Sequence, residues 1–514
     1  MQYEIIIYIS VKLKDLDTEL SAILAQIVEK EPEIEQIISE LSDTYTLSAK
    51  NLLRYLILRT YDVSRYHDSL SDLGLSSLRT AEGYVYSNLF CIVKHVRLLQ
   101  GKPYRKRKEI EIIGYQKSKK LIKTHANDLF NKKQKKQFTE IMVTLPLEAA
   151  HDKTIIRNMV KSGMEIARIN LSHGTIAIWT KMIQHIHEVK QETKQEVKIF
   201  MDLSGPKIRT SQIEIRGKKG KVKNSITVRN GERIVLTKRL TLGKKSKFSK
   251  KNEQVQKAEI GVLLHEIIDD VQVNDVVLFD DGMIQSVVVS KSADEVEIEI
   301  TNCYKTKLSS HKGINLPHTK LHLPALTDAD IKHLPFVCEH ANIVGYSFVR
   351  NQNDVKQLYS YLDTLGATDL GVVFKIENKE AVENLPFILL EGMRRNKIGV
   401  MIARGDLAVE IGFEKISEIQ NHILLLCEAA HVPVIWATQV LDNLAKTGIP
   451  TRAEISDVAQ GVQAECIMLN KGPYINEAIR TLKNILVQIE PHSFKKKNTL
   501  KPLDIALNAV GKLF

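Results

Sequence analysis

Phe374-Lys375-Ile376-Glu377-Asn378 and Met401-Ile402-Ala403-Arg404-Gly405-Asp406-Leu407 are the two stretches that decide the fold. In each, a run of apolar residues ends abruptly in charged ones. An apolar run of this length predicts a strand buried on both faces. Because a buried unpaired ion is costly, the charges that follow need partners. Two carboxylates, a lysine and an arginine on neighbouring strand ends suit a divalent-metal and phosphate site, and salt bridges at the strand ends are the alternative.

The same alternation of strand-like runs and amphipathic helical segments fills residues 139–206 and 311–491. Three strand-like runs lie in the first segment and five in the second. Eight strands alternating with helices predict an α/β fold, the (β/α)8 TIM barrel. Residues 207–310 instead hold short β-type runs separated by turns, which predicts a small all-β domain inserted into the barrel. Gly205-Pro206 predicts the turn that leads into it.

The two ends of the chain differ from the barrel. Residues 1–138 carry apolar residues at helical spacing, for example over 48–59, and predict a helical N-terminal extension. Residues 492–514 predict a short C-terminal tail.

The composition excludes several classes of function. The net charge is +12, and the basic residues fall in runs over 102–108, 132–136, 218–223 and 244–251. Because aromatic residues do not alternate with them, a solvated surface or steering of an anionic substrate is favoured over nucleic-acid binding. No apolar stretch is long enough for a membrane span, and the first residues lack the features of a secretory signal. The five scattered cysteines fit reduced thiols, so we expect a cytoplasmic protein with no membrane partner.

Polar residues follow the predicted strands at the same point each time. They are Asn170 and Ser172, Asp202, Ser347 and Arg350, Lys375 and Glu377, Arg404 and Asp406, Thr438, and Asn470. A TIM barrel gathers the carboxyl ends of its strands on one face, where barrel enzymes have their active sites. The convergence predicts an enzyme.

With these residues assembled, the chain resembles pyruvate kinases over residues 139–490. The matching motifs come in the family's order: Lys161-Ser162-Gly163 through Ile169-Asn170-Leu171-Ser172-His173-Gly174, Asp202-Leu203-Ser204-Gly205-Pro206-Lys207, Asp280-Asp281-Gly282, Lys312-Gly313-Ile314-Asn315-Leu316-Pro317, Lys375-Ile376-Glu377-Asn378, Ala403-Arg404-Gly405-Asp406-Leu407, Ala437-Thr438-Gln439 and Pro450-Thr451-Arg452-Ala453-Glu454.

The resemblance implies the glycolytic transfer of a phosphoryl group from phosphoenolpyruvate to ADP, giving pyruvate and ATP. It implies that Glu377 and Asp406 hold Mg²⁺ or Mn²⁺, a role that suits carboxylate oxygens. Lys375 and Arg168 would bind the phosphoryl group. Thr438 and the amides near Gly405 and Asp406 would bind the substrate carboxylate.

On the nucleotide side, the resemblance implies that Asn170, His173 and Arg209 face the phosphates of ADP. Lys312 would reach in from the hinge of the inserted domain, which resembles the family's lid. A simpler interpretation is that Asn170 and Ser172 only cap the following helix.

The chain departs from the family pattern at several points. Lys207 stands where potassium-requiring members have glutamate, so we expect no K⁺ requirement; Asn170, Ser172 and Asp202 would otherwise suit a K⁺ site. Asn470-Lys471-Gly472-Pro473 and Thr144-Leu145-Pro146 replace loops that lie on the family's nucleotide side. These changes leave the choice of nucleotide open.

The tail leaves no room for the family's C-terminal effector domain, so the usual effector regulation is expected to be missing. The N-terminal extension resembles that of a less common bacterial form, with a partner that the sequence does not identify. Pro450-Thr451-Arg452-Ala453-Glu454 resembles the interface between barrels and suggests a homodimer. The alternatives to a kinase are a phosphoenolpyruvate-binding regulatory protein and another phosphoenolpyruvate or pyruvate enzyme on the same barrel.

Overall fold

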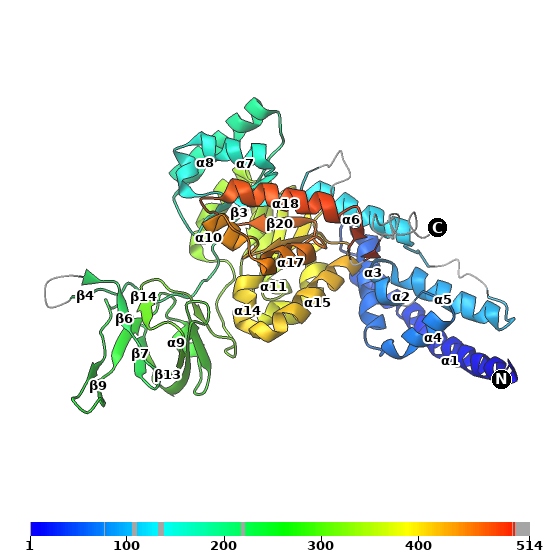
Figure 1. The fold of residues 1–514 in the computed structure, drawn as a ribbon, viewed down its shortest axis with the longest axis horizontal. Coiled ribbons are helices and arrows are strands. Elements are labelled where there is room, and N and C mark those ends of the chain that lie inside the picture. Colours follow the sequence, from blue (N-terminus) through cyan, green and yellow to red (C-terminus); the bar gives the residue numbers. More distant parts are fainter. Residues whose placement is uncertain are drawn as a thin grey trace, which may run out of the picture.

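The computed structural model describes residues 2–76, 78–104, 110–131, 138–216, 222–495 and 497–498. Parts of the predicted basic runs (105–108, 132–136 and 218–221) and most of the predicted tail (496 and 499–514) lie outside the described residues. Within these ranges the molecule is a row of three parts, with the barrel between a β domain and a group of helices (Figure 1). None of the described helices has the length and apolar character needed to span a membrane.

Eight parallel strands form a closed barrel, which confirms the predicted fold class. Each strand pairs with the next, and β20 pairs with β1 to close the ring. Every residue of β17 and β18 is buried, as the apolar runs that open the sequence analysis predict. In chain order the strands are β1 (Glu140–Thr144), β2 (Ile166–Asn170), β3 (Lys198–Asp202), β16 (Ile343–Tyr346), β17 (Gly371–Ile376), β18 (Ile398–Ala403), β19 (Val434–Ala437) and β20 (Cys466–Leu469).

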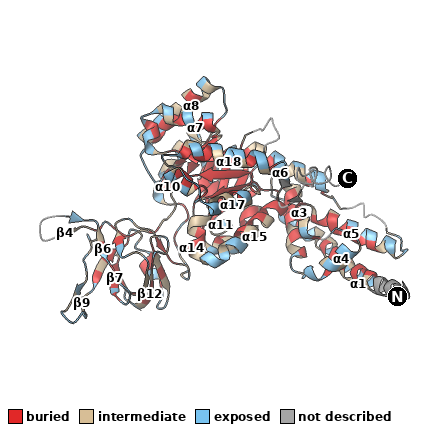
Figure 2. Cartoon of the chain, viewed as in Figure 1, coloured by how far each residue is buried: buried red, intermediate tan, exposed pale blue. Residues whose placement is uncertain are grey.

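Helices follow the strands and surround the barrel (Figure 2). Several begin at side-chain caps in the loops: the Asp152 carboxylate accepts a hydrogen bond from the Thr154 N–H, and the Asn378 amide oxygen accepts one from the Ala381 N–H. The helices are α7 (Lys153–Ser162), α8 (Ile176–Thr193), α10 (Asp328–His340), α11 (Gln352–Thr364), α12 (Lys379–Glu383), α13 (Leu385–Gly392), α14 (Arg404–Ile411), α15 (Ile416–Ala429), α16 (Asp442–Thr447), α17 (Arg452–Gly461) and α18 (Ile475–Ile489).

A β domain is inserted between β3 and β16, and we call it the lid domain (207–216 and 222–315). Its main sheet has six strands in the order β10 (Ala258–Gly261), β7 (Arg233–Thr237), β13 (Glu295–Cys303), β12 (Ile284–Lys291), β11 (Val276–Phe279) and β15 (Ile314–Asn315). β15 lies beyond residue 310, the predicted end of the insertion. Around the sheet lie three strand pairs and a short helix: β4 (Ile215–Arg216) with β5 (Val222–Lys223), β6 (Ser225–Thr227) with β14 (Lys307–Ser309), β8 (Lys247–Phe248) with β9 (Gln254–Gln256), and α9 (Ile267–Asp270).

The N-terminal extension is helical, as predicted. It contains α1 (Gln2–Glu29), α2 (Glu31–Ile38), α3 (Thr46–Leu58), α4 (His67–Asp72), α5 (Val85–Leu99) and α6 (Tyr115–Leu129). The end of α6 enters the barrel interior, where Leu129 and Phe130 join a buried cluster with Met142, Phe200 and Met401. We call Leu129 and Phe130 the plug of the barrel. A Cβ added at Gly399 would lie 2.6 Å from a Leu129 methyl carbon, so glycine at this position makes room for the plug.

Candidate active site

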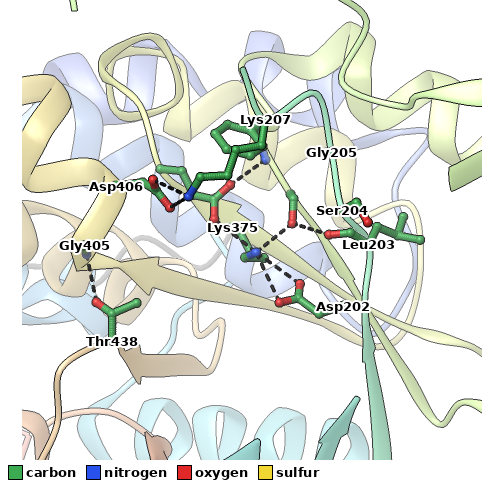
Figure 3. Close-up of polar contacts among 12 residues, drawn as sticks. Asp202, Leu203, Ser204, Gly205, Lys207, Lys375, Gly405, Asp406 and Thr438 are labelled. Carbon is green, nitrogen blue, oxygen red and sulfur yellow. Dashed lines mark hydrogen bonds and ion pairs between the residues drawn. The ribbon is translucent and has the colours of Figure 1, made fainter. Parts of the chain in front are cut away.

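The predicted site residues of β2, β3 and β17 meet at the carboxyl ends of the strands around one buried ammonium group. Lys375 Nζ lies 3.1 Å from Asp202 Oδ1 and 3.0 Å from Glu377 Oε1. It also donates a hydrogen bond of 2.6 Å to Ser347 Oγ, whose hydroxyl donates to the Leu203 carbonyl (Figure 3). Lys375 is 8% exposed and Glu377 is 2% exposed, so these charges are largely removed from water.

Arg168 reaches the same carboxylate from β2. Its Nε donates a hydrogen bond of 3.0 Å to Asp202 Oδ2, and its Nη2 forms an ion pair with the same oxygen. Its Nη1 donates a hydrogen bond of 2.8 Å to Thr144 Oγ1 at the end of β1. The structure therefore brings Arg168, Lys375 and Asp202 together, and it fixes the direction of the guanidinium.

The charges of this group shift each other's pKa values. Burial alone would raise the pKa of Asp202, but Lys375 and Arg168 hold it below its ordinary value. Burial alone would lower the pKa of Lys375, and the charges of Asp202 and Glu377 raise it instead. Burial raises the pKa of Glu377 against the opposing charge of Lys375, and the charge of Asp406 adds to the rise. The surrounding carboxylates thus favour the charged form of Lys375, and a further positive charge would favour the charged form of Glu377.

Glu377 and Asp406 are the residues that would hold a divalent metal. Both line a cavity of about 440 Å³ between the barrel and the lid domain. No group of three or more His, Cys, Asp or Glu arranged to hold a metal is found among the described residues. Two carboxylates still fit Mg²⁺, which takes one or two protein carboxylates and completes its shell with water and substrate oxygens. The raised pKa of Glu377 is a second sign of fit: burial is its main cause and the charge of Asp406 adds to it, and a bound cation would oppose both by favouring the charged carboxylate.

Lys207 forms an ion pair with Asp406, one of the two carboxylates that would hold the metal. Its Nζ is 2.9 Å from Asp406 Oδ1 and 3.2 Å from Asp406 Oδ2 (Figure 3). Asp202, the carboxylate of the predicted K⁺ group, is paired with Arg168 and Lys375.

Thr438 and Gly405 are brought together above the ends of β19 and β18. Thr438 Oγ1 accepts a hydrogen bond of 2.8 Å from the Gly405 N–H (Figure 3). Thr438 and Gln439 both have positive φ, of 64° and 54°, a backbone conformation that side chains of this kind seldom adopt. Strain of this sort persists only where the surrounding structure holds it.

Arg404 provides that restraint, and its contacts favour the alternative of a salt bridge at the strand end over a place in the phosphate site. Its guanidinium donates to the carbonyls of Ala437 (2.9 Å) and Thr438 (2.6 Å). It also forms a two-point ion pair with Asp457 on α17 and lies over the ring of Trp436. All three guanidinium nitrogens of Arg404 make contacts that hold the loop, so Arg404 positions Thr438.

The barrel mouth holds a second cavity of about 380 Å³, lined by Arg168, Asn170, His173, Gly405 and Thr438 together with Lys471. Asn170 does not cap the next helix: its Oδ1 accepts from the Ser172 N–H in a turn, and α8 begins after Thr175. Burial lowers the pKa of His173, and the charges of Lys471, Arg209 and Arg168 lower it further. Basic side chains thus converge on His173.

Arg209 and Lys312 remain engaged within the lid domain. Arg209 Nη1 donates to the His311 carbonyl at 2.9 Å, and Lys312 Nζ is 2.7 Å from Asp280 Oδ1. The structure does not bring Lys312 to the barrel mouth.

Two supporting residues escaped the sequence analysis: Asp457, the partner of Arg404, and Asp330. Ser347, which the sequence places at a strand end, is the partner of Lys375. The buried Asp330 carboxylate accepts the backbone N–H groups of Ser204 and Gly205 at 2.9 and 3.1 Å. Thr327-x-x-Asp330 is a capping box that starts α10. That motif could have marked Asp330 as a helix start, but its second role depends on tertiary structure.

The chain is similar to known proteins. A family model described as "Pyruvate kinase, barrel domain" matches residues 136–479. A pyruvate kinase from Staphylococcus haemolyticus is 31% identical over 386 residues, which make up 73% of this chain and 61% of that relative. One from Geobacillus stearothermophilus is 33% identical over 365 residues, or 69% of this chain and 57% of that relative. The chain spans about three fifths of the length of the curated relatives it matches.

A solved structure agrees with these relatives. The crystal structure of a pyruvate kinase from Cryptosporidium parvum matches with a TM-score of 0.60 and 27% sequence identity, covering 73% of this chain and 72% of that one.

Proposed function

The chain belongs to the pyruvate kinase family, and we propose that it transfers the phosphoryl group of phosphoenolpyruvate to ADP, giving pyruvate and ATP. The observation that carries the proposal is the buried ion cluster in which Lys375 contacts Asp202 and Glu377 while Arg168 contacts Asp202. Phosphoryl transfer depends chiefly on positioning and charge neutralisation, and this cluster offers two fixed cations at the barrel mouth.

In this proposal Lys375 and Arg168 bind the phosphoryl group. The pKa of Lys375 is raised, so its ammonium stays charged and acts by stabilising the negative charge of the transfer step rather than by giving up a proton. Asp202 holds both cations in place. Thr438 binds the substrate carboxylate, from a loop that Arg404 fixes.

Glu377 and Asp406 would hold Mg²⁺ or Mn²⁺. When bound, the ion would neutralise charge on the phosphoryl group and on the enolate that remains after transfer. Lys207 supplies a fixed positive charge at this site, which supports the proposal that K⁺ is not required.

For the nucleotide, we propose that Asn170 and His173 bind its phosphates at the barrel mouth, joined by Arg209 and Lys312 when the lid domain closes. Closure of this kind excludes water from the transfer step. Asn470 and Lys471 line the mouth cavity, so the altered loop remains able to contact a nucleotide.

A cytoplasmic location is supported by the free cysteines of the described chain and by the class of reaction. A homodimer through residues 450–454 is supported by the exposed Ile449 beside them, which is 70% exposed.

A second candidate is a regulatory protein that binds phosphoenolpyruvate without transferring its phosphoryl group. The ion pairs that engage Asp406 with Lys207 and Lys312 with Asp280 favour it, because they occupy residues that the transfer needs.

Pyruvate formation from phosphoenolpyruvate and ADP with Mg²⁺, measured with and without K⁺, tests the proposal. We expect activity without K⁺ and its loss by a factor of about 10²–10³ or more in Lys375→Met. If no nucleoside diphosphate supports pyruvate formation while phosphoenolpyruvate still binds, the regulatory function replaces the kinase.

A further inference from the structure

Lys207 binds the carboxylate that the proposed function assigns to a divalent metal. Its Nζ lies within 3.2 Å of both Asp406 oxygens. The two side chains are 33% and 21% exposed, so the ion pair is partly shielded from water. An ammonium group that contacts both oxygens of a carboxylate occupies the position that a metal ion would take on that carboxylate.

The charges of the site balance without any added ion. Three carboxylates and three cations are paired there in two groups: Asp202 and Glu377 with Arg168 and Lys375, and Asp406 with Lys207. A divalent ion entering at Glu377 and Asp406 therefore competes with the positive charge of Lys207.

The backbone that carries Lys207 is fixed to the barrel. Asp330 accepts the N–H groups of Ser204 and Gly205, and the Lys207 N–H donates to the Gly205 carbonyl at 2.9 Å. Gly205 has a φ of 64°, and a Cβ there would lie 2.6 Å from the ring of Phe348, so this turn requires glycine. From this turn the Lys207 side chain crosses to α14 of the barrel.

The ion pair also lies at the border between the two cavities. Lys207, Asp406 and Glu377 line the cavity on the lid side, whereas Gly405 and Thr438, next to Asp406, line the mouth cavity. A substrate that uses the metal carboxylates and Thr438 together must reach across this border.

We propose that Lys207 is a tethered cation that holds the metal site of the free protein closed. It occupies Asp406 until a divalent metal ion displaces it, and displacement releases the link between the lid hinge and α14. This inference rests on the proposed function for the identity of the metal site.

The test is Mn²⁺ binding to the full-length, substrate-free protein, followed by the electron paramagnetic resonance signal of free Mn²⁺. Lys207→Gln removes the competing ammonium, and we expect it to bind Mn²⁺ about fivefold more tightly than the unmodified protein, the factor that a partly exposed ion pair supplies. Lys320→Gln is the matched control, because it removes a lysine from the lining of the same cavity.

Hydrogen exchange of the hinge amides gives a second measurement. We expect faster exchange at residues 204, 205, 207 and 208 in metal-free Lys207→Gln, and the same increase in the unmodified protein when Mn²⁺ is added. Unchanged Mn²⁺ affinity in Lys207→Gln, or an equal gain in Lys320→Gln, overturns the inference, and so does a failure of both proteins to bind Mn²⁺. A protein that shows the Mn²⁺ effect but forms no pyruvate loses the proposed function and keeps the tethered cation.

Discussion

The lid domain and the N-terminal helices lie on opposite sides of the barrel (Figure 1) and are attached to it in opposite ways. The lid domain has an apolar core of its own, separate from that of the barrel. The buried side chains of α1, α3 and α5 instead belong to one continuous core with the barrel. A region with its own core can move as a body, whereas a region that shares a core must unfold to separate.

The polar contacts of the two regions with the barrel differ in the same way. The helical region is joined to the barrel through buried hydrogen bonds: His431 Nδ1 lies 3.1 Å from Ser48 Oγ, and its Nε2 lies 2.9 Å from the Gly83 carbonyl oxygen. The lid domain contacts the barrel through the partly exposed Lys207–Asp406 ion pair and a 3.0 Å hydrogen bond from Asn315 to Glu410. We infer that the chain uses the first region for stability and the second for motion.

The largest expected effect comes from the plug. Leu129→Ala should lower the free energy of unfolding of the barrel by about 2–5 kcal/mol, because it leaves a cavity where a buried leucine fills the barrel end. Both tryptophans, Trp179 and Trp436, lie buried in the barrel region. Urea unfolding followed by tryptophan fluorescence therefore reports on the barrel.

Ile298→Ala in the lid core is the matched control, since Ile298 is equally buried. We expect it to destabilise the lid domain and to leave the tryptophan transition nearly unchanged. Equal shifts in the two variants would show that the lid domain and barrel unfold as one unit, which contradicts the comparison.

A smaller loss of unfolding free energy is expected at the buried hydrogen bonds that join the N-terminal helices to the barrel. Asn51 donates to the carbonyls of Glu82 and Ala429 at 2.7 and 2.8 Å and accepts the Val85 N–H at 3.0 Å. Asn51→Leu keeps the volume but removes these three bonds, so we expect a loss of about 2–3 kcal/mol in the tryptophan transition.

Asn315→Leu serves as the comparison on the lid side, because it removes the hydrogen bond to Glu410. We expect a loss of about 1 kcal/mol or less in the same transition. A larger loss in Asn315→Leu than in Asn51→Leu would reverse the assignment of the two regions.

The sequence predicts the barrel well because each strand is marked locally. An apolar run that ends in charge, as at Phe374-Lys375, reports burial and strand end together. The sequence also places Lys375, Arg168 and Asp202 on one face, because strand ends in a barrel converge. The close contacts of these residues could not be read from it, since they depend on side-chain direction.

The features that the sequence does not predict depend on contacts between residues far apart in the chain. Arg404 follows a strand like the candidate site residues, yet Asp457 and two carbonyls engage it, and nothing near Arg404 in the sequence signals this. The plug likewise could not be predicted: residues 115–129 form an ordinary amphipathic helix, and only the fold places Leu129 against Gly371 and Gly399.

An effect smaller than those of Leu129→Ala and Asn51→Leu concerns pH at the border between barrel and lid domain. Burial raises the pKa of Glu410 to about 7, although its hydrogen bond from Asn315 opposes the rise, and the charge of Asp406 adds to it. A raised carboxyl pKa means that the folded protein holds the proton more tightly than the unfolded chain. The stability that protonated Glu410 contributes is therefore complete below about pH 4.5 and is lost as the pH rises through about 7.

Glu410→Gln retains an oxygen to accept the Asn315 N–H and cannot ionise. We expect it to be more stable than the unmodified protein at pH 8 by about 1–2 kcal/mol, after allowance for partial exposure, and nearly equal to it at pH 4.5. Glu414→Gln, at an exposed position just beyond the same helix, should show no such difference in the tryptophan transition. A gap between Glu410→Gln and the unmodified protein that stays constant from pH 4.5 to pH 8 would mean that Glu410 does not titrate in this range. The contact between Glu410 and the lid domain would then not respond to pH in this range.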